Sequence, residues 1–233
     1  MKYISKRGRP LAYARWCASV AGTNKENFSE VPRAEKQALL NALIEEQGAL
    51  CAYTMKRIGE GSSHVEHIKP QSRCTTGEDL DYGNLVACFP LLGMKPPHRY
   101  GAQQKGGWWE DNGSSFVSPL HPNCEKRFRF GLDGAIVPAN NHPDAAATIQ
   151  ILALDNASLT EDRKRVISEF IYGPRGSDAL TAAQAKRFET DICGRIGRAQ
   201  FPEFCVAIRC ALGEYLRMLD RRTQRTRAIR ARR

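Results

Sequence analysis

The stretch that decides the fold is His64-Val65-Glu66-His67-Ile68-Lys69-Pro70, followed by Asp81-Tyr82-Gly83-Asn84. Apolar residues flank the Glu-His pair, and the closing proline has no amide hydrogen to give to a sheet. We therefore predict a short strand that ends at this proline. A second strand is predicted over residues 49–54, and the glycine- and serine-rich residues 59–63 predict the turn between the two.

The pair Glu66-His67 has the side chains needed for metal-assisted hydrolysis of a phosphodiester bond. A histidine can take a proton from water, and a carboxylate is a hard oxygen ligand for Mg²⁺. Adjacent side chains on a flat strand point to opposite faces, so a strand end or a bulge is needed for both to serve one site. The alternative is an exposed histidine beside an exposed glutamate, without a catalytic role.

Outward from this stretch, the sequence predicts an α+β chain with most of its helix in the C-terminal half. Pro32 and Gly48 bracket a helix with an apolar stripe, and a shorter helix is expected near residues 12–18. Residues 89–115 read as an irregular, proline- and glycine-rich insertion. Further segments are a strand at 116–120, a hairpin pairing 128–130 with 135–137, and helices at 145–152, 159–171, 180–198 and 204–219.

Charge and cysteine usage narrow the class of protein. Of 233 residues, 35 are Lys or Arg and 25 are Asp or Glu, and the net charge of +10 favours a polyanionic partner such as nucleic acid. No apolar run is long enough to span a membrane. The basic N-terminus has no apolar stretch behind it as a signal peptide would, so we expect a cytoplasmic protein. In such a protein the eight scattered cysteines, without a CxxC pair, are expected to be reduced thiols.

An ordered set of short motifs resembles the HNH endonuclease superfamily. More narrowly, the chain resembles the retron- and Septu-associated HNH nucleases of bacterial anti-phage defence. The motifs are Glu46-Gln47-Gly48-Ala49-Leu50-Cys51-Ala52-Tyr53, Val65-Glu66-His67-Ile68-Lys69-Pro70-Gln71-Ser72, Leu80-Asp81-Tyr82-Gly83-Asn84-Leu85, Ser118-Pro119-Leu120-His121-Pro122-Asn123-Cys124-Glu125 and Thr148-Ile149-Gln150-Ile151-Leu152-Ala153-Leu154-Asp155.

This resemblance implies a small ββα-metal (HNH) core embedded in a mostly helical chain, and a catalytic Mg²⁺ or Mn²⁺. His67 would be the general base, Asn84 would orient it or join the metal shell, and Glu66 would bind the metal. The third signature position falls on His98 or Gln103, and His98 is the expected second metal ligand. Apart from the resemblance, we expect the basic side chains of Lys69, Lys105, Arg225 and Arg227 to contact nucleic acid.

Relatives of this kind often carry four zinc-binding cysteines, and this chain departs from that pattern. Cys51 and Cys88 are present, whereas Thr54 and Tyr100 stand where two more cysteines would be expected. Losing two of four ligands indicates loss of the whole structural zinc site. We therefore expect no structural zinc and two buried thiols.

The expected organisation is an N-terminal arm (1–30), an HNH nuclease core with the insertion (31–142), a helical C-terminal region (143–220) and a basic tail (221–233). The resemblance implies DNA as substrate rather than RNA, and an ABC-type ATPase partner that docks on the helical region. The tail is expected to be mobile when free, and to bind either phosphates or a protein partner. Two alternatives stay open: a catalytically decayed nucleic-acid-binding or scaffold subunit, and a nuclease toxin held inactive by its partner.

Overall fold

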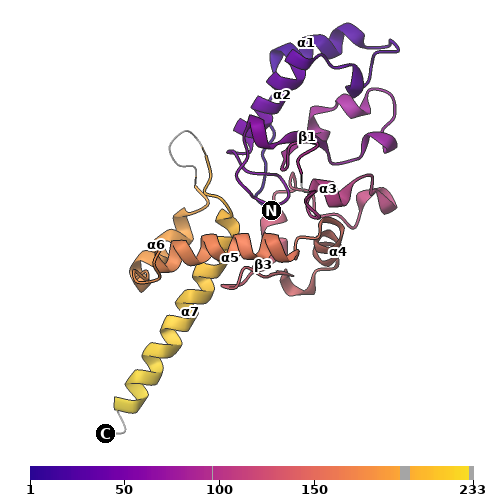
Figure 1. The fold of residues 1–233 in the computed structure, drawn as a ribbon. Helices are drawn as coiled ribbons and strands as arrows, with labels where there is room; N and C mark the ends of the chain where they lie inside the picture. The colour runs from indigo at the N-terminus through magenta and orange to yellow at the C-terminus, as the bar shows by residue number, and fades with distance from the viewer. Residues whose placement is uncertain (96, 195–199, 231–233) are drawn as a thin grey trace.

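The computed structural model describes residues 1–95, 97–194 and 200–230, and these form a mixed helical and antiparallel sheet structure (Figure 1). The α+β class is therefore confirmed. Along the chain the elements are α1 (Leu11–Val20), α2 (Arg33–Glu46), β1 (His64–His67), β2 (Leu85–Cys88), α3 (Ala102–Lys105), β3 (Phe128–Phe130), β4 (Ile136–Pro138), α4 (Pro143–Leu152), α5 (Ala157–Tyr172), α6 (Ala182–Asp191) and α7 (Cys205–Arg230).

Helix α2 is the helix that the sequence predicts between Pro32 and Gly48. Its leucines at 39, 40 and 43 are buried, and it packs against β1 and β2. Gly48 follows the helix with a φ of +61°, and a Cβ there would lie 2.4 Å from the Phe201 ring. Only glycine satisfies both the left-handed backbone and this close contact. The short helix expected near residues 12–18 is α1, which packs on α2.

Strand β1 pairs with β2 in an antiparallel ladder that sets His64 opposite Cys88 and His67 opposite Leu85. The prediction that residues 49–54 form its partner strand was wrong. That segment makes only an isolated bridge between Leu50 and Arg57. Its backbone closes on itself, because Met55 takes a left-handed φ of 63° and donates from its amide to the carbonyl of Cys51. The result is a tight turn that rests on the edge of β2.

The prediction of a strand at residues 116–120 was also wrong. The amide of Val117 donates to the hydroxyl of Thr148 on α4, and the carbonyl of Pro119 accepts from Ile4 of the N-terminal arm. The proline itself has no amide hydrogen for a ladder. The hairpin that follows is confirmed as β3 and β4, with Gly134 in the turn at a φ of +78°. The insertion at 89–115, of which residue 96 lies outside the described residues, contains α3 and short turns.

The C-terminal half is helical, as predicted. Helix α7 does not end near Leu219, and continues through the basic segment to Arg230. The segment is rich in arginine and has no glycine or proline after Gly213, so nothing local stops the helix. Figure 1 shows this part of α7 projecting away from the body. Residues 195–198 of the predicted helix and 231–233 of the tail lie outside the described residues. Within the described chain, every helix is too short or too polar to cross a membrane.

Candidate active site

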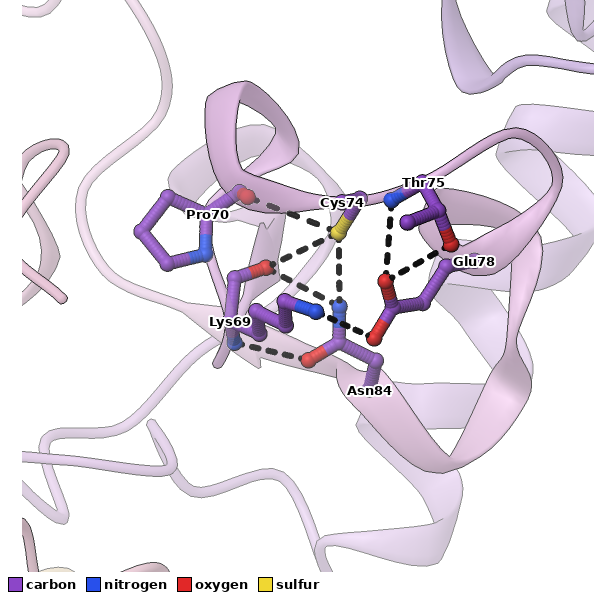
Figure 2. Close-up of polar contacts among 6 residues, drawn as sticks. All are labelled: Lys69, Pro70, Cys74, Thr75, Glu78 and Asn84. Atoms are coloured by element: carbon purple, nitrogen blue, oxygen red, sulfur yellow. Dashed lines mark hydrogen bonds and ion pairs between the residues drawn. The ribbon is translucent and has the colours of Figure 1, made fainter. Parts of the chain in front are cut away.

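The side chain of Asn84 fastens the end of β1 to the start of β2. Its Oδ1 accepts from the backbone amide of Lys69 at 2.7 Å, and its Nδ2 donates to the carbonyl of the same residue at 3.0 Å (Figure 2). The backbone amide of Ile68 donates to the carbonyl of Asn84 at 2.9 Å. These three bonds close the connection between the strands into a loop, so Asn84 contacts the backbone two residues beyond His67.

Within this loop, Glu78 binds the side chain of Lys69 and the start of its own turn. Its carboxylate accepts from the Lys69 ammonium at 2.5 Å, and from the Thr75 amide and hydroxyl at 2.9 and 3.1 Å (Figure 2). The hydrogen bond from Lys69, followed by the one from the Thr75 amide, lowers the pKa of Glu78 to about 2. Lys69, expected to contact nucleic acid, is therefore held within the loop in this structure.

His67 is buried, with 6% of its surface exposed, and its ring has a defined orientation. Its Nε2 lies 3.0 Å from the carbonyl oxygen of Asp79, and the edge of Phe28 packs against it at 4.7 Å between ring centroids. A carbonyl oxygen only accepts, so Nε2 carries the hydrogen and Nδ1 keeps its lone pair. Burial, the largest influence, lowers the pKa of His67, which keeps the ring neutral and able to take a proton.

Glu66 points toward α3, where it meets the buried ammonium of Lys105. The Lys105 Nζ lies 3.0 Å from Glu66 Oε1 and donates to the carbonyl of His67 at 2.9 Å. Lys105 is 1% exposed as a side chain and Glu66 is 16% exposed. The structure thus places Lys105, expected on the nucleic-acid surface, inside the protein as the counter-charge of Glu66.

His64 also lies beside Glu66, although it is not among the site residues predicted from the sequence. The two side chains share one face of β1, and His64 Nε2 is 3.8 Å from Glu66 Oε2. The His64 Nδ1 hydrogen-bonds to the carbonyl of Pro90. Burial opposes a charge on this ring, but the contacts with Glu66 and Pro90 outweigh it and raise the pKa of His64. Strand alternation, which pairs residues i and i+2, was the signal that could have identified it.

His98 lies in a different environment. Its ring packs against Phe89 at 4.8 Å and Tyr100 at 5.4 Å between centroids. Burial, followed by the positive charge of Lys56, lowers its pKa. Gln103, the other candidate, accepts from the backbone amide of His98 at 2.8 Å. Each of these contacts lies within the insertion and its neighbours, and Glu66 takes part in none of them.

The expected arginine contacts lie farther along the chain. Arg225 and Arg227 are exposed on the projecting part of α7. Their side chains are accessible to a phosphate backbone or to a partner protein.

The positions suspected of having lost a zinc site do come together. Cys51 and Cys88 are free, buried thiols, as predicted. Burial acts to raise the pKa of Cys51, but hydrogen bonds from Cys88, Thr54 and the Phe89 amide outweigh it and lower the value to about 6. The methyl group of Thr54 lies against Gly101, since a Cβ built on that glycine would be 3.2 Å from it. Gly101 directly follows the buried Tyr100 in the sequence. Two thiols and a hydroxyl therefore meet where a zinc site would need four strong ligands.

The residues around Glu66 are chemically suited to a divalent cation. Glu66 supplies a carboxylate oxygen, and His64 supplies a ring nitrogen on the same face. Mg²⁺ in enzymes often has one or two carboxylates, with waters and substrate phosphate completing its shell. No group of three or more His, Cys, Asp or Glu side chains arranged for a metal occurs among the described residues, so water and phosphate would have to supply the remaining ligands.

Comparison with known proteins gives an informative match. No family model matches the chain. A curated protein of Vibrio cholerae serotype O1 biovar El Tor, described as "Retron Vc95 putative HNH endonuclease", is 30% identical to it over 145 residues, which cover 59% of this chain and 67% of that protein.

Proposed function

Because this chain belongs to the family of retron-associated HNH endonucleases, we propose that it is a nuclease that hydrolyses DNA phosphodiester bonds with a divalent metal ion. The observation that carries the proposal is the orientation of His67, whose Nε2 is engaged by the Asp79 carbonyl while Nδ1 keeps a free lone pair. The neighbouring Glu66 supplies a carboxylate one residue away. His67 is the last residue of β1, and this strand end is what allows both side chains to serve one site in the proposal. In this proposal β1, β2 and α3 make up the ββα-metal core.

His67 acts as the general base. Its Nδ1 takes the proton from the attacking water, and its low pKa keeps the ring neutral near pH 7. The Asp79 carbonyl then stabilises the ring by accepting from Nε2–H at 3.0 Å. Asn84 acts through the backbone of Lys69, because its bonds hold the segment that follows His67. Asn84 is therefore a positioning residue in this mechanism.

Glu66 would hold Mg²⁺ or Mn²⁺, which when bound stabilises the negative charge that develops on the phosphate. Lys105 balances the charge of Glu66 from 3.0 Å and fixes the backbone of His67 through its carbonyl. The same ammonium thus holds both residues of the Glu-His pair in place.

The biological setting is proposed from the family. A retron-associated relative supports a role in anti-phage defence. From the resemblance to Septu-associated nucleases, we propose that the protein acts in the cytoplasm beside an ABC-type ATPase partner. The helical region from 143 to 220 is the proposed docking surface, and DNA is preferred to RNA as substrate. The net charge of +10 and the exposed Arg225 and Arg227 are consistent with a nucleic-acid substrate.

The test is cleavage of duplex and single-stranded DNA by the wild type and by His67→Ala, with Mg²⁺ or Mn²⁺. Loss of a general base should lower the rate about 10²–10⁴-fold while the thermal unfolding transition is retained. His121→Ala, at an exposed histidine, is the matched control and should cleave normally. Wild-type rates in His67→Ala would refute the assignment. A wild type that binds DNA and never cleaves it would instead favour the scaffold subunit.

A further inference from the structure

His64 has the position and orientation of a metal ligand that no motif assigns. Strand alternation brings its ring to the same face of β1 as Glu66, and both side chains are largely buried, at 8% and 16% exposed. The His64 Nδ1 carries a hydrogen toward the Pro90 carbonyl, because that oxygen can only accept. The other ring nitrogen, Nε2, therefore faces Glu66 at 3.8 Å.

We propose that His64 Nε2 and the Glu66 carboxylate bind the catalytic cation together, and that this mixed nitrogen–oxygen site prefers a first-row transition-metal ion to Mg²⁺. The inference rests on the proposed function, since it concerns the metal of that same site. His64 thereby takes the place of His98 as the nitrogen ligand.

The distance fits a shared ion. Ligands about 2.1 Å from one metal lie about 3 Å apart in adjacent positions and about 4 Å apart in opposite ones. The 3.8 Å between His64 Nε2 and Glu66 Oε2 falls within this range, so only small side-chain rotations are needed. The remaining positions suit water and a phosphate oxygen of the substrate.

The Pro90 contact has the form expected around a metal-bound histidine. Such histidines generally donate their second ring N–H to a carbonyl or carboxylate, which fixes the tautomer and the ring direction. In this chain the Pro90 carbonyl takes that role through Nδ1 of His64. His98 lies in a different arrangement, since its ring packs against the aromatic rings of Phe89 and Tyr100.

The nitrogen ligand is what sets the metal preference. Mg²⁺ favours an all-oxygen shell and gains little from imidazole, whereas affinity for imidazole-containing sites rises along the first-row series from Mn²⁺ to Ni²⁺. A site made of Glu66 alone would discriminate weakly between these ions. A site made of Glu66 and His64 should bind Ni²⁺ much more tightly than Mg²⁺.

The experiment is calorimetric titration of the full chain with Ni²⁺ and with Mg²⁺, without nucleic acid. The key variant is His64→Asn, because an asparagine amide can still donate to the Pro90 carbonyl but has no atom at the Nε2 position. It should weaken Ni²⁺ binding about tenfold or more and change Mg²⁺ binding less than about twofold. His98→Asn is the matched control and should leave both affinities unchanged. The cysteine thiols are common to all variants, so differences between variants report on the histidines.

The variant Glu66→Gln distinguishes a failure of the His64 assignment from a failure of the whole proposed metal site. If Glu66→Gln loses Ni²⁺ binding and His64→Asn retains wild-type affinity, the inference is refuted while the proposed metal site stands. If Glu66→Gln also retains wild-type affinity, the metal assignment of the proposed function fails. Should His64→Asn not fold, Ni²⁺-induced paramagnetic shifts of the histidine ring signals in the wild type decide the matter. Shifts at the His64 ring support the inference, and shifts at the His98 ring alone overturn it.

Discussion

Replacing Asn84 by alanine should destabilise the protein, because it removes both hydrogen bonds that this side chain makes with the backbone of Lys69. A neutral hydrogen bond contributes about 0.5–1.5 kcal/mol net, and a buried group left without a partner costs about 1–3 kcal/mol. The two hydrogen bonds are only partly buried, so in the variant water can reach the Lys69 amide and carbonyl that lose their partner. We therefore expect the free energy of unfolding to fall by about 2–3 kcal/mol.

The measurement is urea-induced unfolding, followed by circular dichroism, of the wild type, Asn84→Ala and the control Asn24→Ala. Asn24 is exposed in the loop after α1, and its replacement should change the midpoint little. A third variant, Asn84→Asp, retains the acceptor for the Lys69 amide but places a carboxylate oxygen against the Lys69 carbonyl. It should therefore be destabilised as well, although it differs from asparagine by one atom.

An unchanged urea midpoint in Asn84→Ala would refute this account of the residue. It would mean that Asn84 acts directly on metal or substrate, as the family resemblance also allows. If the account is right, activity and stability fall together, and a higher metal concentration does not restore cleavage. The reason is that the lost bonds hold the segment after His67, and Asn84 supplies no metal ligand in this arrangement.

Three further predictions concern other parts of the chain. Because burial lowers the pKa of His67, the cleavage rate should rise with pH through a midpoint below about 6.5, and a midpoint above 7 in a pH–rate profile would contradict the base assignment. Elemental analysis should find no stoichiometric zinc, since Cys51 and Cys88 supply only two of four ligands; one tightly held zinc per chain would overturn this. Deleting residues 221–233 should weaken DNA binding at low salt and flatten the slope of log K against log salt without abolishing cleavage. An unchanged slope with loss of a protein complex would assign the tail to a partner.

Local patterns predicted much of the fold. The helix ended by Gly48, the hairpin turning at Gly134 and the helices after Pro143 each have a signal within a few residues. Strand β1 was also predicted, but its partner was not. An apolar run such as 49–54 is buried whether it forms a strand or a turn, so hydrophobicity alone could not distinguish the two.

The motif gives the candidate residues of the site but not their contacts. It points to Glu66, His67 and Asn84, and only the structure shows that Asn84 binds the Lys69 backbone. Lys105 was expected to contact nucleic acid, and only the fold brings it to Glu66 across 39 positions of sequence. A buried lysine is unusual unless it has such a counter-charge. His64 was overlooked although alternation along the strand already placed it on the same face as Glu66.

The spacing between His67 and Asn84 follows from how the loop is closed. The loop's ends are joined by the bonds between Asn84 and Lys69, and its interior is joined to the base by the Asp79 carbonyl on His67 Nε2. Asp79 is fixed in turn, because its carboxylate accepts from the Phe28 amide at 2.7 Å and Phe28 packs on the His67 ring. Inserting or removing a residue between Asp79 and Asn84 would therefore displace the carbonyl that selects the tautomer of the base. The spacing within the motif therefore determines which ring nitrogen of His67 carries the hydrogen. The other nitrogen, Nδ1, is the one that can accept a proton as the base.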